Sequence, residues 1–211
     1  LVLIHITDTG RVIYGKEETS GQKKFNEVDT VNGTVTFTTD SCSPFVLARK
    51  AGVSVKGRVT SCNGRNDLAV TLYDAGTETV VQRITVTGSG EATRDFSFDT
   101  VAAGTYDLVV TKPGHLTYTV KGVVVGDDPL DLTTMTGKAY QTITLLCGDI
   151  NGDGSINEDD VSIIRYANNI NKSTADADNK LADINGDGSV NEDDVSIVRY
   201  SSHINKGVTA C

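Results

Sequence analysis

Short stretches of alternating apolar and polar residues fill the middle of the chain. They are rich in β-branched residues and are separated by Gly, Asn and Asp, which favour turns. The clearest stretches cover 53–59, 68–73, 80–86, 106–110 and 116–120. A period of two between frequent turns predicts β-strands, and a series of such strands predicts an all-β sandwich over residues 51–145.

Residues 1–50 show a weaker version of the same pattern. Strands are predicted over 1–6, 11–14 and 33–39, and three or four strands do not easily close a core. This segment is therefore either the end of a preceding β module or part of the sandwich that follows. Its expected core residues are Phe37, Phe45, Val46 and Leu47.

The last third of the chain contains a tandem repeat. Residues 149–166 return as 183–200, an offset of 34 residues. Only two positions differ, Ile156 against Val190 and Ile164 against Val198, and both changes keep an apolar side chain. This near-identity indicates a duplicated structural unit.

Each copy matches a twelve-residue calcium loop. Such loops place oxygen ligands at positions 1, 3 and 5, a backbone carbonyl at 7, a ligand at 9 that often acts through water, and a carboxylate at 12. Gly154 and Gly188 occupy position 6, where the chain must turn sharply. The candidate ligands are Asp149, Asn151, Asp153, Ser155, Asn157 and Asp160 in the first loop, and Asp183, Asn185, Asp187, Ser189, Asn191 and Asp194 in the second.

The ligand types favour calcium, at two ions per chain. Oxygen donors without Cys or His argue against zinc and copper, and a flexible loop with seven ligands suits calcium better than magnesium. Position 12 is Asp where an EF-hand usually has Glu, which leaves bidentate coordination open. Ile156 and Val190 are expected to anchor the two loops together. The alternative is an Asx-rich turn, or a helix start that carries acids for dipole reasons.

A helix is predicted after each loop. Apolar residues follow helical spacing at Ile163, Ile164, Ala167 and Ile170, and in the second copy at Ile197 and Val198, with Ser201 and Ile204 at the equivalent places. No matching helix precedes either loop, so each unit is a calcium loop with an exit helix.

The duplicated loop-helix units make residues 146–211 resemble a dockerin, the calcium-dependent module that binds cohesins. The resemblance implies a small all-α module, a cohesin module of a scaffoldin as partner, and a secreted protein held in a cellulosome-like assembly. Residues 51–145 resemble carboxypeptidase-regulatory-like or transthyretin-like, Ig-like sandwiches, in the place of an X-module that serves as a spacer. The expected organisation is thus multidomain: 1–50, 51–145 and 146–211.

The resemblance also implies a cohesin-binding face on the two helices. Dockerins often carry a Ser/Thr pair just before position 12, where this chain has Glu158-Asp159 and Glu192-Asp193, so a more electrostatic face is expected. Because both copies carry the same groups, either helix could bind the same cohesin; the alternative is a pair of solvated helix faces. The candidate residues are Glu158, Asp159, Ser162, Arg165 and Tyr166, with Glu192, Asp193, Ser196, Arg199 and Tyr200.

Four cysteines allow three disulfide pairings, and an even number suits an extracellular protein. Dockerin termini usually meet in a clasp, so the resemblance implies a Cys147–Cys211 bridge, which leaves Cys42 to pair with Cys62. No CxxC spacing is present, which argues against zinc or dithiol chemistry.

Charge and composition exclude several classes. Residues 147–211 hold 12 acidic against 5 basic residues of a chain with net charge -9, so no basic footprint for nucleic acid exists. No apolar run approaches the roughly 20 residues that cross a bilayer. The chain begins at Leu1 without a signal peptide and is expected to be a mature or excised piece.

A non-catalytic role is expected, because His5, His115 and His203 are scattered, lack a nucleophile motif and are expected at surfaces or turns. The alternative is an extracellular calcium-stabilised surface protein whose β region binds polysaccharide. Such binding needs an aromatic platform, and with Trp absent the available residues are Tyr14, Tyr73, Tyr106, Tyr118 and Tyr140.

Overall fold

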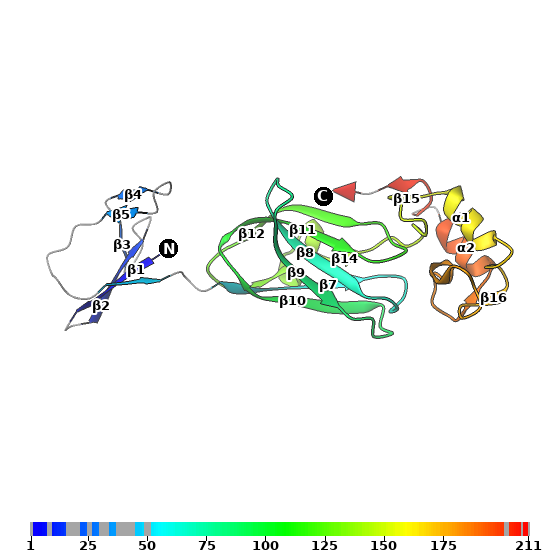
Figure 1. The fold of residues 1–211 in the computed structure, drawn as a ribbon, viewed down its shortest axis with the longest axis horizontal. Helices are drawn as coiled ribbons and strands as arrows, with labels where there is room; N and C mark the ends of the chain where they lie inside the picture. Colours follow the sequence, from blue (N-terminus) through cyan, green and yellow to red (C-terminus); the bar gives the residue numbers. More distant parts are fainter. Residues whose placement is uncertain are drawn as a thin grey trace. The chain divides into compact units, whose positions relative to one another are not determined.

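The computed structural model describes residues 2–7, 10–15, 22–24, 27–29, 34–36, 45–48, 52–200, 203–207 and 209–210. The chain divides into two compact units, residues 1–51 and 52–211, which are considered separately (Figure 1). The side chains of the first unit, including the expected core residues Phe37, Phe45, Val46 and Leu47, lie outside the described part.

The first unit is built from β-strands. Four of them form a sheet in the order β3-β2-β1-β6, and β4 pairs with β5 in a separate ribbon. The strands β1, β2 and β5 fall within or close to the predicted segments. The bounds are β1 Val2–Thr7, β2 Gly10–Gly15, β3 Gln22–Lys24, β4 Glu27–Asp29, β5 Thr34–Thr36 and β6 Phe45–Ala48. Two expectations stay predictions: that this unit is the end of a preceding module, and that a domain boundary lies near residue 145.

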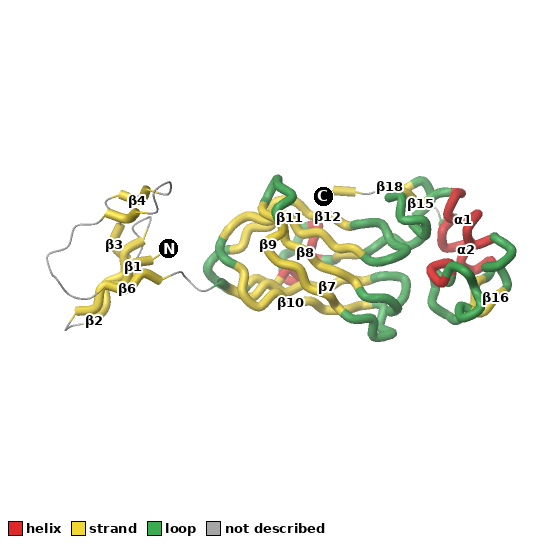
Figure 2. Tube along the Cα trace, in the orientation of Figure 1, coloured by secondary structure: helices red, strands yellow, loops and turns green. Residues whose placement is uncertain are grey.

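The second unit begins with the predicted β-sandwich (Figure 2). One sheet has the order β10-β7-β13, with β14 also on β7, and contains β7 Val53–Thr60, β10 Thr93–Val101, β13 Leu130–Asp131 and β14 Ile143–Thr144. The other has the order β19-β12-β11-β8-β9, with β8 Leu68–Asp74, β9 Val80–Val86, β11 Gly104–Thr111, β12 Tyr118–Val125 and β19 Thr209–Ala210. The long strands pair antiparallel, whereas β13, β14 and β19 join in parallel.

One apolar core lies between the two sheets. Along β7 the buried Val55 and Val59 alternate with exposed Lys56 and Arg58, as one-sided burial requires. Both sheets contribute to the core, β7 and β10 with Val55, Val59, Phe96 and Phe98, and β8 and β11 with Val70, Leu72, Leu108 and Val110. Gly57 is required on β7, since a Cβ there would lie 2.4 Å from the Phe96 ring.

Two strands differ from the sequence prediction. Strand β10 was not predicted, because Arg94 stands at a buried position of its alternating pattern, where an apolar residue is expected. Strand β12 begins at Tyr118 instead of residue 116 and runs to Val125, with a register shift where it pairs with β11. Two 3-10 turns, η1 Leu132–Thr134 and η2 Ala139–Gln141, then lead the chain to β14.

The remaining part is the small helical region. Its elements are β15 Ser155–Ile156, α1 Glu158–Arg165, β16 Lys172–Ser173, η3 Lys180–Ala182, β17 Ser189–Val190, α2 Glu192–Val198 and β18 Lys206–Gly207. Both helices are shorter than predicted. Helix α1 ends before Ala167 and Ile170 because Tyr166 leaves helical geometry at φ −57° and ψ 138°, and Ile204 lies in a turn beyond α2. Ile170 and Ile204 still pack against the core from these turns.

The two calcium-loop candidates do not pair with each other through Ile156 and Val190. Strand β15 pairs with β18, and β17 pairs with β16, so each loop is fixed by a different segment. Both side chains are nevertheless fully buried in one apolar cluster. That cluster also takes in Leu116 and the half-buried Cys62 from sandwich loops, so the helical region packs on one end of the sandwich.

Among the described residues, no helix combines the length and apolar character needed to cross a bilayer.

Candidate calcium loops and partner surface

The carboxylate at position 12 closes each loop. Asp160 Oδ1 accepts hydrogen bonds from the backbone N–H of Ile150 at 2.8 Å and Asn151 at 3.3 Å, and its Oδ2 accepts one from Asn157 at 2.9 Å. Asp194 repeats this arrangement with Ile184, Asn185 and Asn191 at 2.8, 3.2 and 2.9 Å. The sequence folds this way because Asn157 and Asn191 cap α1 and α2 in reciprocal capping boxes with these aspartates.

The remaining loop residues hold a tight series of turns. Asn151 Oδ1 accepts from Asp153 N at 3.0 Å, and Asp153 Oδ1 accepts from Ser155 N at 2.8 Å. The position-6 glycines have positive φ, +86° at Gly154 and +104° at Gly188, as the sharp turn predicted from sequence requires. The second loop repeats the same bonds at Asn185, Asp187 and Ser189.

The loops gather negative charge at buried positions. Asp149, Asp160, Asp183 and Asp194 are all at most 5% exposed. Burial is the main cause that raises the pKa of Asp149 and of Asp194, partly opposed by backbone N–H donors. Asp149 Oδ1 is buried and has no hydrogen-bond partner in the described part of the chain. A buried, unpartnered carboxylate oxygen among several acids fits a hard cation bound by oxygen ligands.

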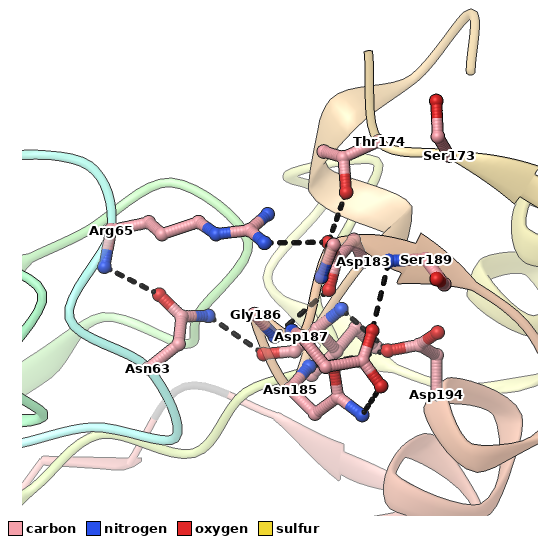
Figure 3. Close-up of polar contacts among 12 residues, drawn as sticks. Asn63, Arg65, Ser173, Thr174, Asp183, Asn185, Gly186, Asp187, Ser189 and Asp194 are labelled. Carbon is pink, nitrogen blue, oxygen red and sulfur yellow. Dashed lines mark hydrogen bonds and ion pairs between the residues drawn. The ribbon is translucent and has the colours of Figure 1, made fainter. Parts of the chain in front are cut away.

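The two loops differ in what surrounds position 1. Arg65, from the loop after β7, places its guanidinium Nη2 2.7 Å from Asp183 Oδ2, which Thr174 also contacts through its hydroxyl (Figure 3). Both position-1 aspartates also accept a hydrogen bond from the position-6 glycine, Asp149 Oδ2 from Gly154 N at 3.2 Å and Asp183 Oδ2 from Gly188 N at 3.0 Å. A cavity of about 160 Å³ beside Asp183 is lined by Arg65, Asn63, His115 and Leu181, among others. The sandwich therefore reaches the second loop.

The ten candidate partner residues lie on the exposed sides of α1 and α2 or directly after them. Arg165 pairs with Glu192 through Nη2–Oε2 at 2.6 Å and Nε–Oε1 at 3.2 Å. Arg199 makes the equivalent pair with Glu158, with Nε–Oε1 at 2.9 Å. These reciprocal pairs follow the pseudo-twofold relation of the two copies. Tyr166 and Tyr200 are 57% and 63% exposed.

The structure brings together three residues that the sequence analysis did not connect. Cys62, His115 and Cys147 have their Sγ and ring nitrogen donor atoms within 4.8 Å of one another. Cys62 and Cys147 are both free thiols, so the expected bridges from these residues are absent; Cys42 and Cys211 lie outside the described residues. His115 is 7% exposed and is therefore not a surface residue, but it closes the turn at Pro113-Gly114 with a hydrogen bond to the Lys112 carbonyl, in line with the expected turn position. Chain separations of 53 and 32 residues hide this cluster from any spacing motif.

A buried lysine lies next to this cluster. Lys112 Nζ donates to Ser61 Oγ at 2.9 Å and to the Asn63 carbonyl at 2.6 Å. Burial lowers the pKa of Lys112 to about 8. The pKa of the Cys62 thiol is lowered, first by its hydrogen bond with Cys147 and then by His115, whereas the pKa of Cys147 is raised by the same pairing and by burial.

The tyrosines do not form an exposed aromatic platform in the described part of the chain. Tyr106 is 5% exposed and donates its hydroxyl to the Ala102 carbonyl at 2.8 Å. Tyr118 and Tyr140 pack against the sandwich core, and Tyr73 is half-buried. The side chain of Tyr14 lies outside the described residues.

The observed geometry defines a class: a β-sandwich with a duplicated loop-helix module packed on one end. Residues 147–200 match the family model described as "Dockerin type I domain", so this segment is a dockerin region preceded by a β-sandwich. This confirms the resemblance seen in the sequence.

Similar solved structures include two crystal structures of a type II cohesin–X-dockerin complex from Acetivibrio cellulolyticus, one an N-terminal and one a C-terminal interface mutant. Both share 28% identity with this chain and cover 74% of it and 97% of their own chain, with TM-scores of 0.53 and 0.52. A comparison with curated proteins gave no match. The likeness covers 74% of this chain, whereas the family match covers residues 147–200 alone.

Proposed function

We propose that this chain is a non-catalytic adaptor that binds a cohesin module through its dockerin region. The observation that carries this proposal is the likeness to the X-dockerin complexes, because it covers 74% of this chain and 97% of the matched chain. The β-sandwich then serves as an X-module-like spacer that supports the dockerin region. Such an adaptor acts outside the cell, where it attaches a secreted modular protein to a cellulosome-like scaffold.

The proposed adaptor binds two calcium ions. The carboxylates at positions 1, 5 and 12 of each loop would hold the ion with Asn151 or Asn185 and the carbonyl of Ser155 or Ser189, while Asn157 and Asn191 stand at the water-linked position. A bound calcium offsets the repulsion among buried acids and so fixes the loops that start α1 and α2. Cohesin binding is then calcium-dependent, because the partner surface lies on these helices.

The partner surface is electrostatic and repeated. Each helix presents two acids, a serine, an arginine and an exposed tyrosine in equivalent places, which supports binding of a cohesin by either helix. The acids at Glu158-Asp159 and Glu192-Asp193 favour a cohesin surface that carries complementary basic groups. The family match is to type I dockerins, whereas the similar solved structures are type II complexes. The experiment must therefore include both cohesin types.

The experiment is a calorimetric titration of the EDTA-stripped chain with calcium, followed by capture on immobilised type I and type II cohesins. We expect two bound ions and capture that is lost when calcium is chelated. The variant Asp153→Asn with Asp187→Asn removes one ligand charge per loop and should weaken both. Asp159→Asn with Asp193→Asn removes equal charge at position 11, which supplies no ligand, and should leave calcium binding unchanged. Calcium binding without capture by either cohesin type would reject the adaptor role.

A further inference from the structure

Three side chains with metal-binding donors meet where the sandwich joins the dockerin region. Cys62 follows β7, His115 lies between β11 and β12, and Cys147 directly precedes the first calcium loop. Their donor atoms lie within 4.8 Å of one another, and Cys62 Sγ lies 3.3 Å from His115 Nε2. Two sulfurs and one imidazole nitrogen within this range can share a single tetrahedral ion.

The histidine is oriented for this task. Its Nδ1 lies 2.9 Å from the Pro113 carbonyl, which can only accept a hydrogen bond. Nδ1 therefore carries the proton, and the lone pair of Nε2 points toward Cys62. Histidines that bind metals are usually held in this way, with the far nitrogen donating to a carbonyl or carboxylate.

The backbone around the cluster is fixed. His115 and Cys147 form an antiparallel bridge, Leu116 N donates to the Leu146 carbonyl at 2.8 Å, and Gly148 N donates to the Gly114 carbonyl at 2.9 Å. His115 and Cys147 are 7% and 2% exposed, and Asn63 Nδ2 lies 3.8 Å from Cys62 Sγ as a donor to sulfur. The donors are thus held together before any ion arrives, which lowers the entropic cost of binding one.

We propose that Cys62, His115 and Cys147 bind one zinc ion, separate from the calcium loops. Thiolate and imidazole donors select zinc, whereas the oxygen-only loops select calcium. On binding, each thiol releases its proton to solvent, both sulfurs coordinate as thiolates, and the two negative charges balance the ion. A water molecule completes the tetrahedron.

The ion would link the sandwich to the dockerin region. Two of its ligands belong to sandwich loops and the third begins the dockerin region, so zinc ties the spacer to the first calcium loop through three segments of the chain. This role does not depend on cohesin binding, and it can be tested without a cohesin.

The test uses the full chain with Cys42→Ser and Cys211→Ser, fully reduced and saturated with calcium so that the loops do not take up zinc. We expect one zinc ion per chain by elemental analysis, a higher melting temperature with zinc, and the visible absorption of thiolate-bound cobalt when Co²⁺ replaces it. Cys62→Ser, Cys147→Ser and His115→Gln should each lower zinc affinity at least roughly tenfold. His203→Gln is the matched histidine control and should change nothing.

Two results would overturn the proposal. One is that the reduced, folded Cys42→Ser, Cys211→Ser chain binds no zinc and shows no cobalt–thiolate absorption. This result does not depend on whether the ligand variants fold. The other is a Cys62–Cys147 disulfide in the chain that is secreted with its natural cysteines. Peptide mass spectrometry would show it as a linked pair of peptides whose mass is two hydrogens below the sum of the two separate peptides.

Discussion

Arg65 and Asp183 form an ion pair of 2.7 Å between a sandwich loop and the first position of the second loop. The Arg65 side chain is 33% exposed and the Asp183 side chain 0%, so the pair is largely removed from water. In the described part of the chain, no arginine takes the corresponding place at Asp149 in the first loop, whose Oδ2 accepts a hydrogen bond from Gly154 N. Two loops of nearly identical sequence therefore sit in different surroundings.

Replacing Arg65 should affect the calcium-free chain most. Arg65→Gln leaves the Asp183 carboxylate buried without its guanidinium partner. We expect the free energy of unfolding to fall by about 1–3 kcal/mol in urea titrations with EDTA. Arg83→Gln, on exposed β9, removes an equal charge as a control and should shift it by less than about 0.5 kcal/mol. An equal effect of both variants would contradict a specific role for the pair.

Arg65→Gln, which destabilises the calcium-free chain, should favour calcium binding at the second loop. Because Arg65 and a bound ion compete for the same Asp183 carboxylate, Arg65→Gln should strengthen calcium binding at the second loop and leave the first unchanged. Calorimetry on the variant should then show a higher calcium affinity at one of the two sites and an unchanged affinity at the other. A uniform shift of both sites would refute the competition.

The position-12 aspartates should be structural even without metal. Asp160→Ala removes three backbone hydrogen bonds, one of them the capping-box bond from Asn157, and we expect a loss of about 2–4 kcal/mol in unfolding free energy in EDTA. Asp159→Ala, one residue earlier and exposed, is the matched control. Chemical denaturation followed by circular dichroism measures both, and similar losses would argue against the loop-closing role of Asp160.

The proposed use of either helix predicts an unusual mutational pattern. Ser162 and Ser196 are exposed, and each Oγ donates to a backbone carbonyl of its own helix, that of Glu158 or Glu192. Arginine at either position therefore leaves the cross-helix ion pairs intact. Ser162→Arg or Ser196→Arg alone blocks one of two equivalent modes and should weaken cohesin affinity about twofold, whereas both together should weaken it at least tenfold. A tenfold loss from one single variant, measured by surface plasmon resonance, would show that one face is used.

A pH effect is expected on the sandwich surface. The Arg58 guanidinium, 2.6 Å from Asp95, holds the pKa of that carboxyl below its usual range through a hydrogen bond. Its contribution to stability is therefore present above the ordinary aspartate pKa and is lost as pH falls through the lowered value. Carboxyl-carbon NMR should show a low Asp95 pKa that returns toward normal in Arg58→Gln. An unchanged pKa in the variant would remove Arg58 as its cause.

Local signals in the sequence predicted much of the architecture. The duplicated loops, their position-6 glycines and the sandwich strands β7, β8, β9 and β11 follow from spacing that short-range physics sets. The end of α1 was misplaced because Ile170 keeps helical spacing while it packs from a turn. Arg65 and the Cys62–His115–Cys147 cluster could not be foreseen, since their contacts arise only when sandwich loops meet the dockerin region.

The helical region is attached to the sandwich at both of its ends and on both layers. Ile143–Thr144 pairs with β7 in one sheet, and Thr209–Ala210 pairs with β12 in the other. Tension applied to the helices by a docked partner is thus divided between two strands in different sheets. Each pairing joins two residues to the neighbouring strand, so a force that separates the helical region from the sandwich must break backbone pairing in both sheets.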